Sequence, residues 1–202
     1  MIFKRKIYDE LLRWKRTDEG RTAVLIQGAR RVGKSTVAEE FATNEYDTHI
    51  LVDFAACSSE IRDLFNDVSD LNRIFMRLQL EYGIELRERK SVIIFDEVQL
   101  APKARQAIKY LVKDGRYDYI ETGSLISIRK NVKDILIPSE EVKLHMYPMD
   151  YEEFKWALGD TATINLLQGC FHNRTSLGDA TNRKLMRDFR LYMLIGGCGF
   201  LP

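Results

Sequence analysis

The sequence has 202 residues, of which 45% are hydrophobic and 30% are charged, and its formal net charge is +1. That length suits one large domain, alone or with a small appendage, and the balanced charge gives no global field that would attract nucleic acid. No stretch of about 18 apolar residues occurs, so we expect no membrane span and no membrane partner. The N-terminus lacks the apolar core of a signal peptide.

The cysteines favour a reducing compartment. Cys57, Cys170 and Cys198 lie far apart in the sequence and are odd in number, which fits neither a zinc site nor a disulfide framework. We therefore expect free thiols in a cytoplasmic protein.

The first 20 residues predict a helix that precedes the main domain. Phe3, Ile7, Leu11 and Trp14 recur at helical spacing among lysines and arginines. Such a helix either packs on the domain edge with a solvated basic face, or contacts nucleic acid or anionic lipid. Both roles stay open at this point.

A glycine-rich segment then predicts a phosphate site. The apolar run 23–26 is followed by the pattern G-x-x-x-x-G-K-S over residues 28–35 and by an amphipathic segment over 36–42, the strand–loop–helix context of a P-loop. Glycines let the backbone curl so that N–H groups converge on phosphate oxygens, and the helix adds its positive end. The predicted nucleotide-binding residues are Gly28, Ala29, Arg30, Arg31, Val32, Gly33, Lys34, Ser35 and Thr36.

Residues 91–97 predict the second half of this site. The run Ser-Val-Ile-Ile-Phe is typical of a parallel strand buried on both faces, and it ends in Asp96 and Glu97. We expect Ser35 and Asp96 to serve a Mg²⁺ ion, Lys34 to reach the β- and γ-phosphates, and Glu97 to polarise the attacking water.

Further strands and helices alternate along the chain, which favours an α/β fold with a parallel sheet and helices on both faces. A strand over 117–121 leads into Thr122-Gly123-Ser124, where a hydroxyl could touch the γ-phosphate or the water. Other predicted strands span residues 48–54 and 142–146. Predicted helices span residues 58–66, 70–82, 102–114 and 150–158, with helical patterns over 160–196, while residues 126–130 and a loop lead to the strand at 142–146.

The last predicted helix, about 181–195, carries Arg183, Arg187 and Arg190 at spacings that place them roughly on one face. This face is either solvated or part of a lid that brings an arginine to the nucleotide. Arg116 and Arg129 are candidates to act in trans on a second copy, which would require self-association.

Several motifs resemble a group of bacterial and archaeal AAA+-type ATP-binding proteins of poorly defined role, usually with an additional C-terminal region. They are IQGARRVGKSTVAEEF, SVIIFDEVQLAPKARQAIKYL, YIETGSLISI, ILIPSEEVKLHMYPMDYEEF and LYMLIGG. The resemblance implies a sheet of order 5-1-4-3-2, a small helical C-terminal lid, adenine as the base, and Thr122 or Ser124 as first sensor. Members usually continue Gly-Gly-Met-Pro; here Gly-Gly-Cys-Gly-Phe-Leu-Pro follows, which predicts a shortened copy.

The sequence thus predicts an N-terminal helix over 1–20, a P-loop NTPase domain over 21–149 and a lid-like segment over 150–202. The predicted function is Mg²⁺-dependent binding and slow hydrolysis of ATP, with Glu97, Lys34 and Ser124 as catalytic residues. GTP is disfavoured because Asn-Val-Lys-Asp at 131–134 contains the residue types of the guanine-selecting motif Asn-Lys-x-Asp in a different order. Two alternatives stay open: a non-hydrolysing, nucleotide-gated module that binds an unknown protein, and a nucleic-acid-associated ATPase.

Overall fold

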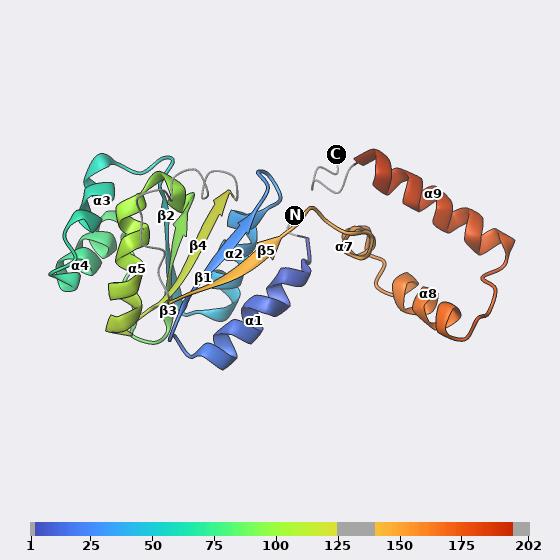
Figure 1. The fold of residues 1–202 in the computed structure, drawn as a ribbon, viewed down its shortest axis with the longest axis horizontal. Coiled ribbons are helices and arrows are strands. Elements are labelled where there is room, and N and C mark those ends of the chain that lie inside the picture. Colours follow the sequence, from blue (N-terminus) through green and yellow to red (C-terminus); the bar gives the residue numbers. More distant parts are fainter. Residues whose placement is uncertain (1–2, 125–139, 196–202) are drawn as a thin grey trace. The chain divides into compact units, whose positions relative to one another are not determined.

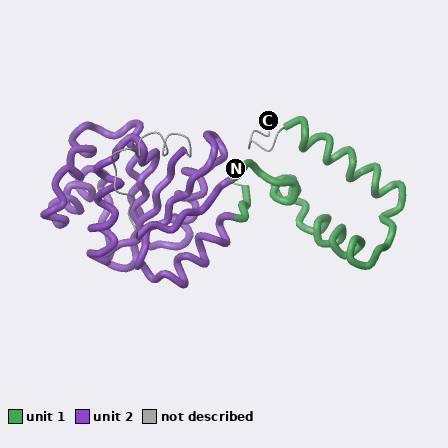
Figure 2. The backbone as a smooth tube through the Cα atoms, viewed as in Figure 1, with its two compact units in different colours: residues 1–6, 147–202 green, residues 7–146 purple. Residues whose placement is uncertain are grey.

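The computed structural model describes residues 3–124 and 140–195. Its chain forms two compact units (Figure 2): residues 7–146 make one, and residues 147–202 together with residues 1–6 make the other. The unit boundary after Met146 lies close to the expected end of the NTPase domain at residue 149. Most of the N-terminal helix belongs to the larger unit.

The larger unit is built on a five-stranded sheet (Figure 1). The strands are β1 (Ala23–Gly28), β2 (Thr48–Asp53), β3 (Ser91–Asp96), β4 (Asp118–Ser124) and β5 (Glu141–Met146). They run parallel in the order β2-β3-β4-β1-β5. This order is 5-1-4-3-2 read from the other edge, so the predicted fold class is confirmed. All five strands therefore end at the same edge of the sheet.

Helices cover both faces of the sheet. The helices are α1 (Lys6–Asp18), α2 (Lys34–Glu45), α3 (Ser59–Asp63), α4 (Leu71–Tyr82) and α5 (Pro102–Asp114). Side chains of α1 and α2 pack on one face, and those of α3, α4 and α5 pack on the other. Within β1, Val24 and Ile26 face the first group while Leu25 faces the second, which is why the strand reads as an unbroken apolar run.

The N-terminal helix packs on the sheet, the first of its two predicted roles. Ile7, Leu11 and Trp14 of α1 are buried in the same cluster as Ile26 and Phe41. Their spacing of four and three places them on one side of the helix, while Arg13 and Arg16 are exposed. The apolar stripe therefore serves the core of the larger unit.

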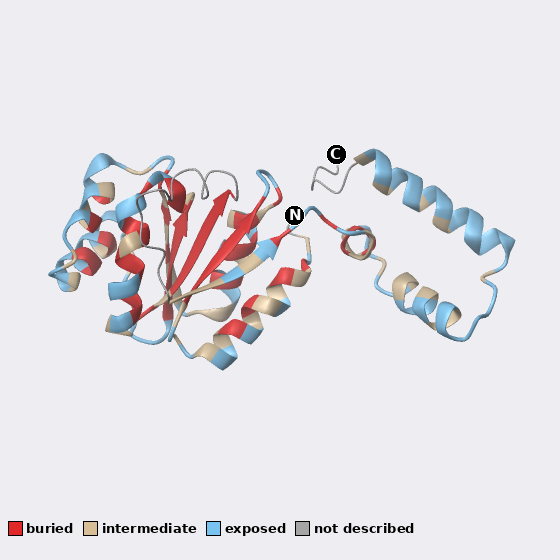
Figure 3. Cartoon of the chain, in the orientation of Figure 1, coloured by how far each residue is buried: buried red, intermediate tan, exposed pale blue. Residues whose placement is uncertain are grey.

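The smaller unit contains α7 (Tyr151–Ala157), α8 (Thr163–His172) and α9 (Asp179–Ile195). Asp150 and Glu153 form a capping box that starts α7. The Lys155 ammonium of α7 lies 2.9 Å from a carboxylate oxygen of Asp188 in α9, and the Tyr192 hydroxyl donates to the Met149 carbonyl. No described residue of α8 or α9 is buried (Figure 3).

A buried charge cluster lies between α5, β4 and β5. The Arg105 guanidinium contacts both carboxylate oxygens of Glu141, with Nη2–Oε2 at 3.1 Å, and lies 4.0 Å from Glu121 Oε2. Neither oxygen of Glu121 accepts a hydrogen bond within the described part of the chain. Burial raises the pKa of the Glu121 carboxyl well above its usual range, and Glu141 raises it further, while Arg105 opposes the shift.

We expect Glu121→Gln to stabilise the protein at pH 8. Above the usual glutamate pKa of about 4.3, the unfolded chain releases the Glu121 proton but the folded chain retains it, so this group costs stability as pH rises. The neutral amide removes that cost, and the gain should shrink toward pH 4.5. Thermal unfolding at several pH values measures it, with the exposed Glu88→Gln as control. A Glu121→Gln protein that is no more stable than the wild type at pH 8 would contradict the expectation.

Candidate functional site

The predicted phosphate loop lies at the carboxyl end of β1. β1 ends at Gly28 and α2 begins at Lys34, so the loop spans the gap between strand and helix. Arg31 and Gly33 adopt left-handed backbone conformations, with φ of 62° and 93°, and glycine reaches such a value without the steric cost that a side chain brings. Ala29, Arg30 and Arg31 are exposed, whereas Val32 is buried in the core. One side chain thus anchors a loop that is otherwise open to solvent.

Lys34 is folded back on its own loop. Its ammonium donates to the carbonyl of Ala29 at 2.8 Å and lies 3.5 Å from that of Gly28, and the residue is only 5% exposed. Burial lowers the pKa of Lys34, while the charges of Glu97 and Asp96 raise it. The ammonium therefore lies in the loop with two carboxylates near it.

The Ser35 hydroxyl joins the loop to the end of β3. It donates to Asp96 Oδ1 at 2.6 Å across 61 residues of sequence. The Thr122 hydroxyl of β4 donates to the same carboxylate oxygen and accepts from the Glu97 N–H at 3.3 Å. Strands β3 and β4 and the helix that follows β1 thus place a carboxylate and two hydroxyls together, because the carboxyl ends of these neighbouring strands share one edge of the sheet.

Glu97 and Ser124 lie at the same edge. Glu97 follows β3 in a left-handed conformation with φ of 52° and is partly exposed. Ser124 is the last residue of β4, stands opposite Gly28 in the register of β1 with β4, and is 4% exposed. The structure therefore brings the predicted catalytic residues Lys34 and Glu97 to one region, with Ser124 beside the start of the loop.

Gly28 is needed for a reason that the loop motif does not reveal. Its backbone has no positive φ, but a Cβ placed there would lie 2.1 Å from the main-chain oxygen of Met146 in β5. β5 pairs with β1 up to this point, and Met146 stands opposite Gly28. The glycine therefore allows two strands to approach closely next to the phosphate site.

We expect Gly28→Ala to destabilise the larger unit by about 1–3 kcal/mol or more, because backbone atoms must move to admit the methyl group. Denaturant unfolding measures the loss. Gly169→Ala in α8 is the matched control: no atom lies within 4 Å of its added Cβ, and alanine favours a helix interior by roughly 1 kcal/mol. A Gly28→Ala protein as stable as the wild type would show that β5 leaves room for a Cβ at this position.

Not every predicted residue gathers at this edge. Arg116 precedes β4 at the opposite edge, where Asp114 accepts from its Nε at 2.7 Å and Asn72 from its Nη1 at 2.7 Å. Arg183, Arg187 and Arg190 are exposed on α9 in the smaller unit. Residues 126–130, which include Arg129, and the 131–134 motif lie outside the described residues, as does Cys198. Cys57 and Cys170 are free thiols.

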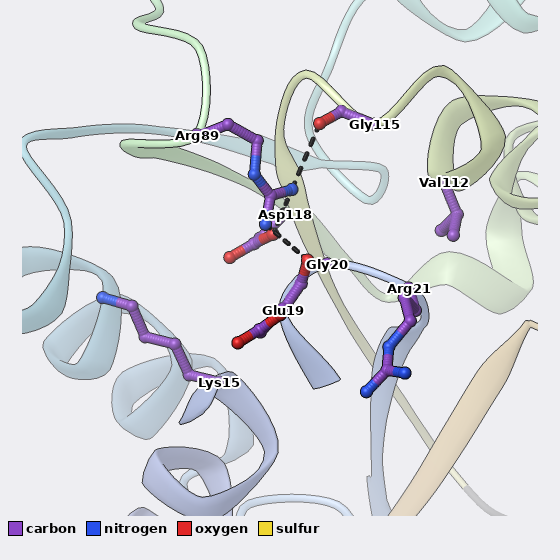
Figure 4. Close-up of a pocket in the computed structure, with 8 residues that line it drawn as sticks. All are labelled: Lys15, Glu19, Gly20, Arg21, Arg89, Val112, Gly115 and Asp118. Carbon is purple, nitrogen blue, oxygen red and sulfur yellow. Dashed lines mark hydrogen bonds and ion pairs between the residues drawn. The ribbon is translucent and has the colours of Figure 1, made fainter. Parts of the chain in front are cut away.

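Figure 4 shows a cavity of about 660 Å³ that is lined in part by Asp118, the first residue of β4, and so lies at the amino edge of the sheet. Three cations line it: Lys15, Arg21 and Arg89. Arg89 donates to the carbonyls of Gly115 at 3.1 Å and Glu19 at 2.5 Å.

The other two cations of this cavity also point to main-chain carbonyls. Arg21 donates to the carbonyls of Thr17 and Asp18, and Lys15 to that of Glu45. These acceptors lie at the ends of α1 and α2, where helices present unsatisfied carbonyls and negative charge. The cations therefore cap helix ends and serve the fold.

No helix in the described ranges is both long and apolar enough to cross a bilayer.

Comparisons with known proteins find a family that the chain matches. A model of the AAA domain family matches residues 20–155. No curated protein matches the sequence significantly. Similar solved structures include the Walker-type ATPase PABY2304 of Pyrococcus abyssi, with 19% identity and a TM-score of 0.47 over 88% of this chain and 60% of that one.

Two further solved structures show the same level of similarity. The Aeropyrum pernix Orc1 protein in complex with DNA has 15% identity and a TM-score of 0.49 over 81% of this chain and 50% of that one. The Thermotoga maritima RuvB Holliday junction branch migration motor has 13% identity and a TM-score of 0.44 over 80% of this chain and 51% of that one. This chain thus spans between half and three fifths of the length of these proteins.

The family match carries more weight than these distant structural similarities. It covers well over half of the chain, from just before β1 into α7, and includes the phosphate loop, Asp96, Glu97 and Thr122. The chain belongs to the AAA domain family, whose fold is that of the nucleotide-binding P-loop NTPases.

Proposed function

We propose that this chain binds ATP together with Mg²⁺ and hydrolyses it slowly. The observation that carries the proposal is the 2.6 Å contact between Ser35 Oγ and Asp96 Oδ1. It places the hydroxyl after the loop lysine against the carboxylate that ends β3, which is the pair that holds the metal in P-loop NTPases.

The donor set fits magnesium. A hydroxyl and one carboxylate are the hard oxygen ligands that Mg²⁺ prefers, and it usually takes the rest of its shell from water and substrate phosphates. Residues 3–124 and 140–195 contain no group of three or more His, Cys, Asp or Glu residues that could hold a metal alone, as expected where phosphates complete the shell. When bound, the ion would neutralise charge on the β- and γ-phosphates.

The chain's own residues would bind the phosphates and activate the water. The N–H groups around Gly33 and the first turn of α2 would donate to the phosphates, and Lys34 would exchange its loop carbonyls for phosphate oxygens. Glu97 would orient the attacking water and accept its proton. Ser124, beside Gly28, would contact the γ-phosphate or the water.

The slow rate in this proposal concerns the arginines. Arg116 is held by Asp114 and Asn72 at the opposite edge of the sheet, so it would not serve the site of its own chain, and an arginine supplied by a second copy would stabilise the charge that develops during phosphoryl transfer. We therefore expect turnover to rise with protein concentration if copies associate.

Isothermal titration with ATP and GTP tests the proposal. We expect micromolar binding of ATP in the presence of Mg²⁺, weaker binding in EDTA, and weak or no binding of GTP. A coupled phosphate assay at several protein concentrations then measures turnover. Absence of ATP binding with Mg²⁺ would overturn the proposal.

A second candidate is a nucleotide-gated module that binds a protein without hydrolysis. The observation that favours it is the smaller unit, where α8 and α9 expose large apolar side chains: Leu166, Phe171, Met186, Phe189, Leu191, Met193 and Leu194. Exposed apolar groups in such number are typical of surfaces that contact a partner. ATP binding with no phosphate release from the wild type would favour this candidate.

A further inference from the structure

We propose that Gln99 is a positioning residue: its side-chain amide holds the Glu97 carboxylate toward the phosphate loop, and turnover depends on this contact. The inference rests on the proposed hydrolysis and names a further residue that it needs.

The contact itself is direct. Gln99 Nε2 donates to Glu97 Oε2. Gln99 is 5% exposed, whereas Glu97 is partly exposed. A buried side chain is confined by its neighbours, so it fixes the group that it contacts more firmly than a solvated one can.

The backbone between the two residues supports the same geometry. Val98–Leu100 form a single 3₁₀ turn, with the Leu100 N–H donating to the Glu97 carbonyl at 2.9 Å and the Ala101 N–H to the Val98 carbonyl at 3.0 Å. Val98 is buried in the core. The turn therefore brings residue 99 back beside residue 97 and anchors both to the sheet.

Glu97 is held at its backbone as well. Its left-handed conformation costs a residue with a Cβ roughly 1–2 kcal/mol, and such conformations persist where the surroundings enforce them. The Thr122 hydroxyl accepts the Glu97 N–H at 3.3 Å. Thr122 thus fixes the main chain of Glu97 while Gln99 fixes its carboxylate.

Glu97 lies at the edge that carries the site. The Thr122 hydroxyl that accepts from the Glu97 N–H also donates to Asp96 Oδ1, which accepts from Ser35 next to the loop lysine, so Glu97 lies on the side of the phosphate loop. A carboxylate has about four acceptor positions, and a neutral amide takes one of them. The others stay available to a water.

The test replaces Gln99 with Met, which has a similar length but no donor. We expect kcat for ATP to fall about 10- to 100-fold, the effect of a misplaced catalytic group, while ATP affinity and melting temperature stay within error of the wild type. Gln106→Met on α5 is the matched control and should change none of these. A Gln99→Met protein with wild-type or higher kcat would overturn the proposal.

A double-mutant cycle separates positioning from general support of the fold. If Gln99 acts only through Glu97, adding Gln99→Met to Glu97→Gln should not slow single-turnover hydrolysis further. An additional 10-fold loss in the double variant would show that Gln99 acts elsewhere, and so would overturn the proposal.

A readout without turnover distinguishes this inference from the proposed function. The ¹⁵N side-chain amide resonance of Gln99 should shift on Glu97→Ala and stay unchanged on Glu39→Ala, a variant on the exposed side of α2. No shift on Glu97→Ala would show that the contact is not made, whatever the ATP assays give. If the Gln99 resonance shifts on Glu97→Ala but the wild type binds ATP without hydrolysing it, the contact is made. Its role in turnover and the proposed hydrolysis are then both overturned.

Discussion

Replacing Lys34 with alanine is expected to weaken ATP binding by roughly 30-fold or more. The ammonium is almost fully buried inside the loop and contacts only two main-chain carbonyls in the described structure, so it is free to exchange them for phosphate oxygens. Removing one partner of a buried, hydrogen-bonded charge pair costs about 2–5 kcal/mol, which corresponds to a loss of roughly 30- to several thousand-fold. Isothermal titration with Mg²⁺ and ATP measures the change.

Two further variants sharpen this result. Lys109→Ala removes the same charge from an exposed position on α5 and should leave ATP affinity unchanged. Lys34→Arg keeps the charge but adds a larger, planar group to a buried position, so we expect it to bind ATP nearly as poorly as the alanine variant. If Lys34→Ala binds ATP as the wild type does, the loop does not hold the phosphates.

The sheet and the loop could be predicted because their signals are local. An apolar run, a glycine pattern and an amphipathic segment follow one another within 20 residues at 23–42. The run at 91–97 shows burial on both faces before it reaches Asp96. The structure confirms the sheet and its order, and it places Asp96 against Ser35. Parallel strands bring their carboxyl ends together whatever lies between them.

The contacts that fix the site could not be predicted in the same way, because they join residues far apart in sequence. The curling of a loop gave one reason for glycine at position 28, but the approach of Met146 from β5 gives another. Thr122 could be expected at the site, yet nothing in the sequence indicates that its hydroxyl holds both Asp96 and the Glu97 N–H. The segment SVIIFDEVQLAPKARQAIKYL, which carries part of the family resemblance, contains Gln99 without indicating a role for it.

The burial of the Glu121 and Glu141 carboxylates could not be predicted from the sequence either. Glu121 and Glu141 stand in short strands where alternation would normally send a charged residue to solvent. Helix α5 covers that face and supplies Arg105 as their partner. A sequence shows that a strand carries a carboxylate, but which face a helix covers is a property of the packed fold.

Replacing Glu97 with glutamine is expected to lower the rate of phosphate release by about 100- to 10,000-fold, the usual contribution of a general base. Glutamine keeps the shape of the side chain but cannot accept the proton of the attacking water. ATP binding should stay within about threefold of the wild type, because in the proposed arrangement Lys34 and the loop amides, rather than Glu97, hold the phosphates. Single-turnover assays with labelled ATP measure the first quantity and isothermal titration the second.

The rate of phosphate release and the ATP affinity together distinguish a Glu97 carboxylate that acts on the water from one that binds ATP. Glu39→Gln, an exposed change on α2, is the control and should leave both rate and affinity unchanged. A Glu97→Gln protein that still releases phosphate at the wild-type rate would assign the base to another residue. One that loses ATP binding together with turnover would instead make Glu97 part of the binding site, since a group that acts only on the water lowers kcat without removing the affinity for substrate.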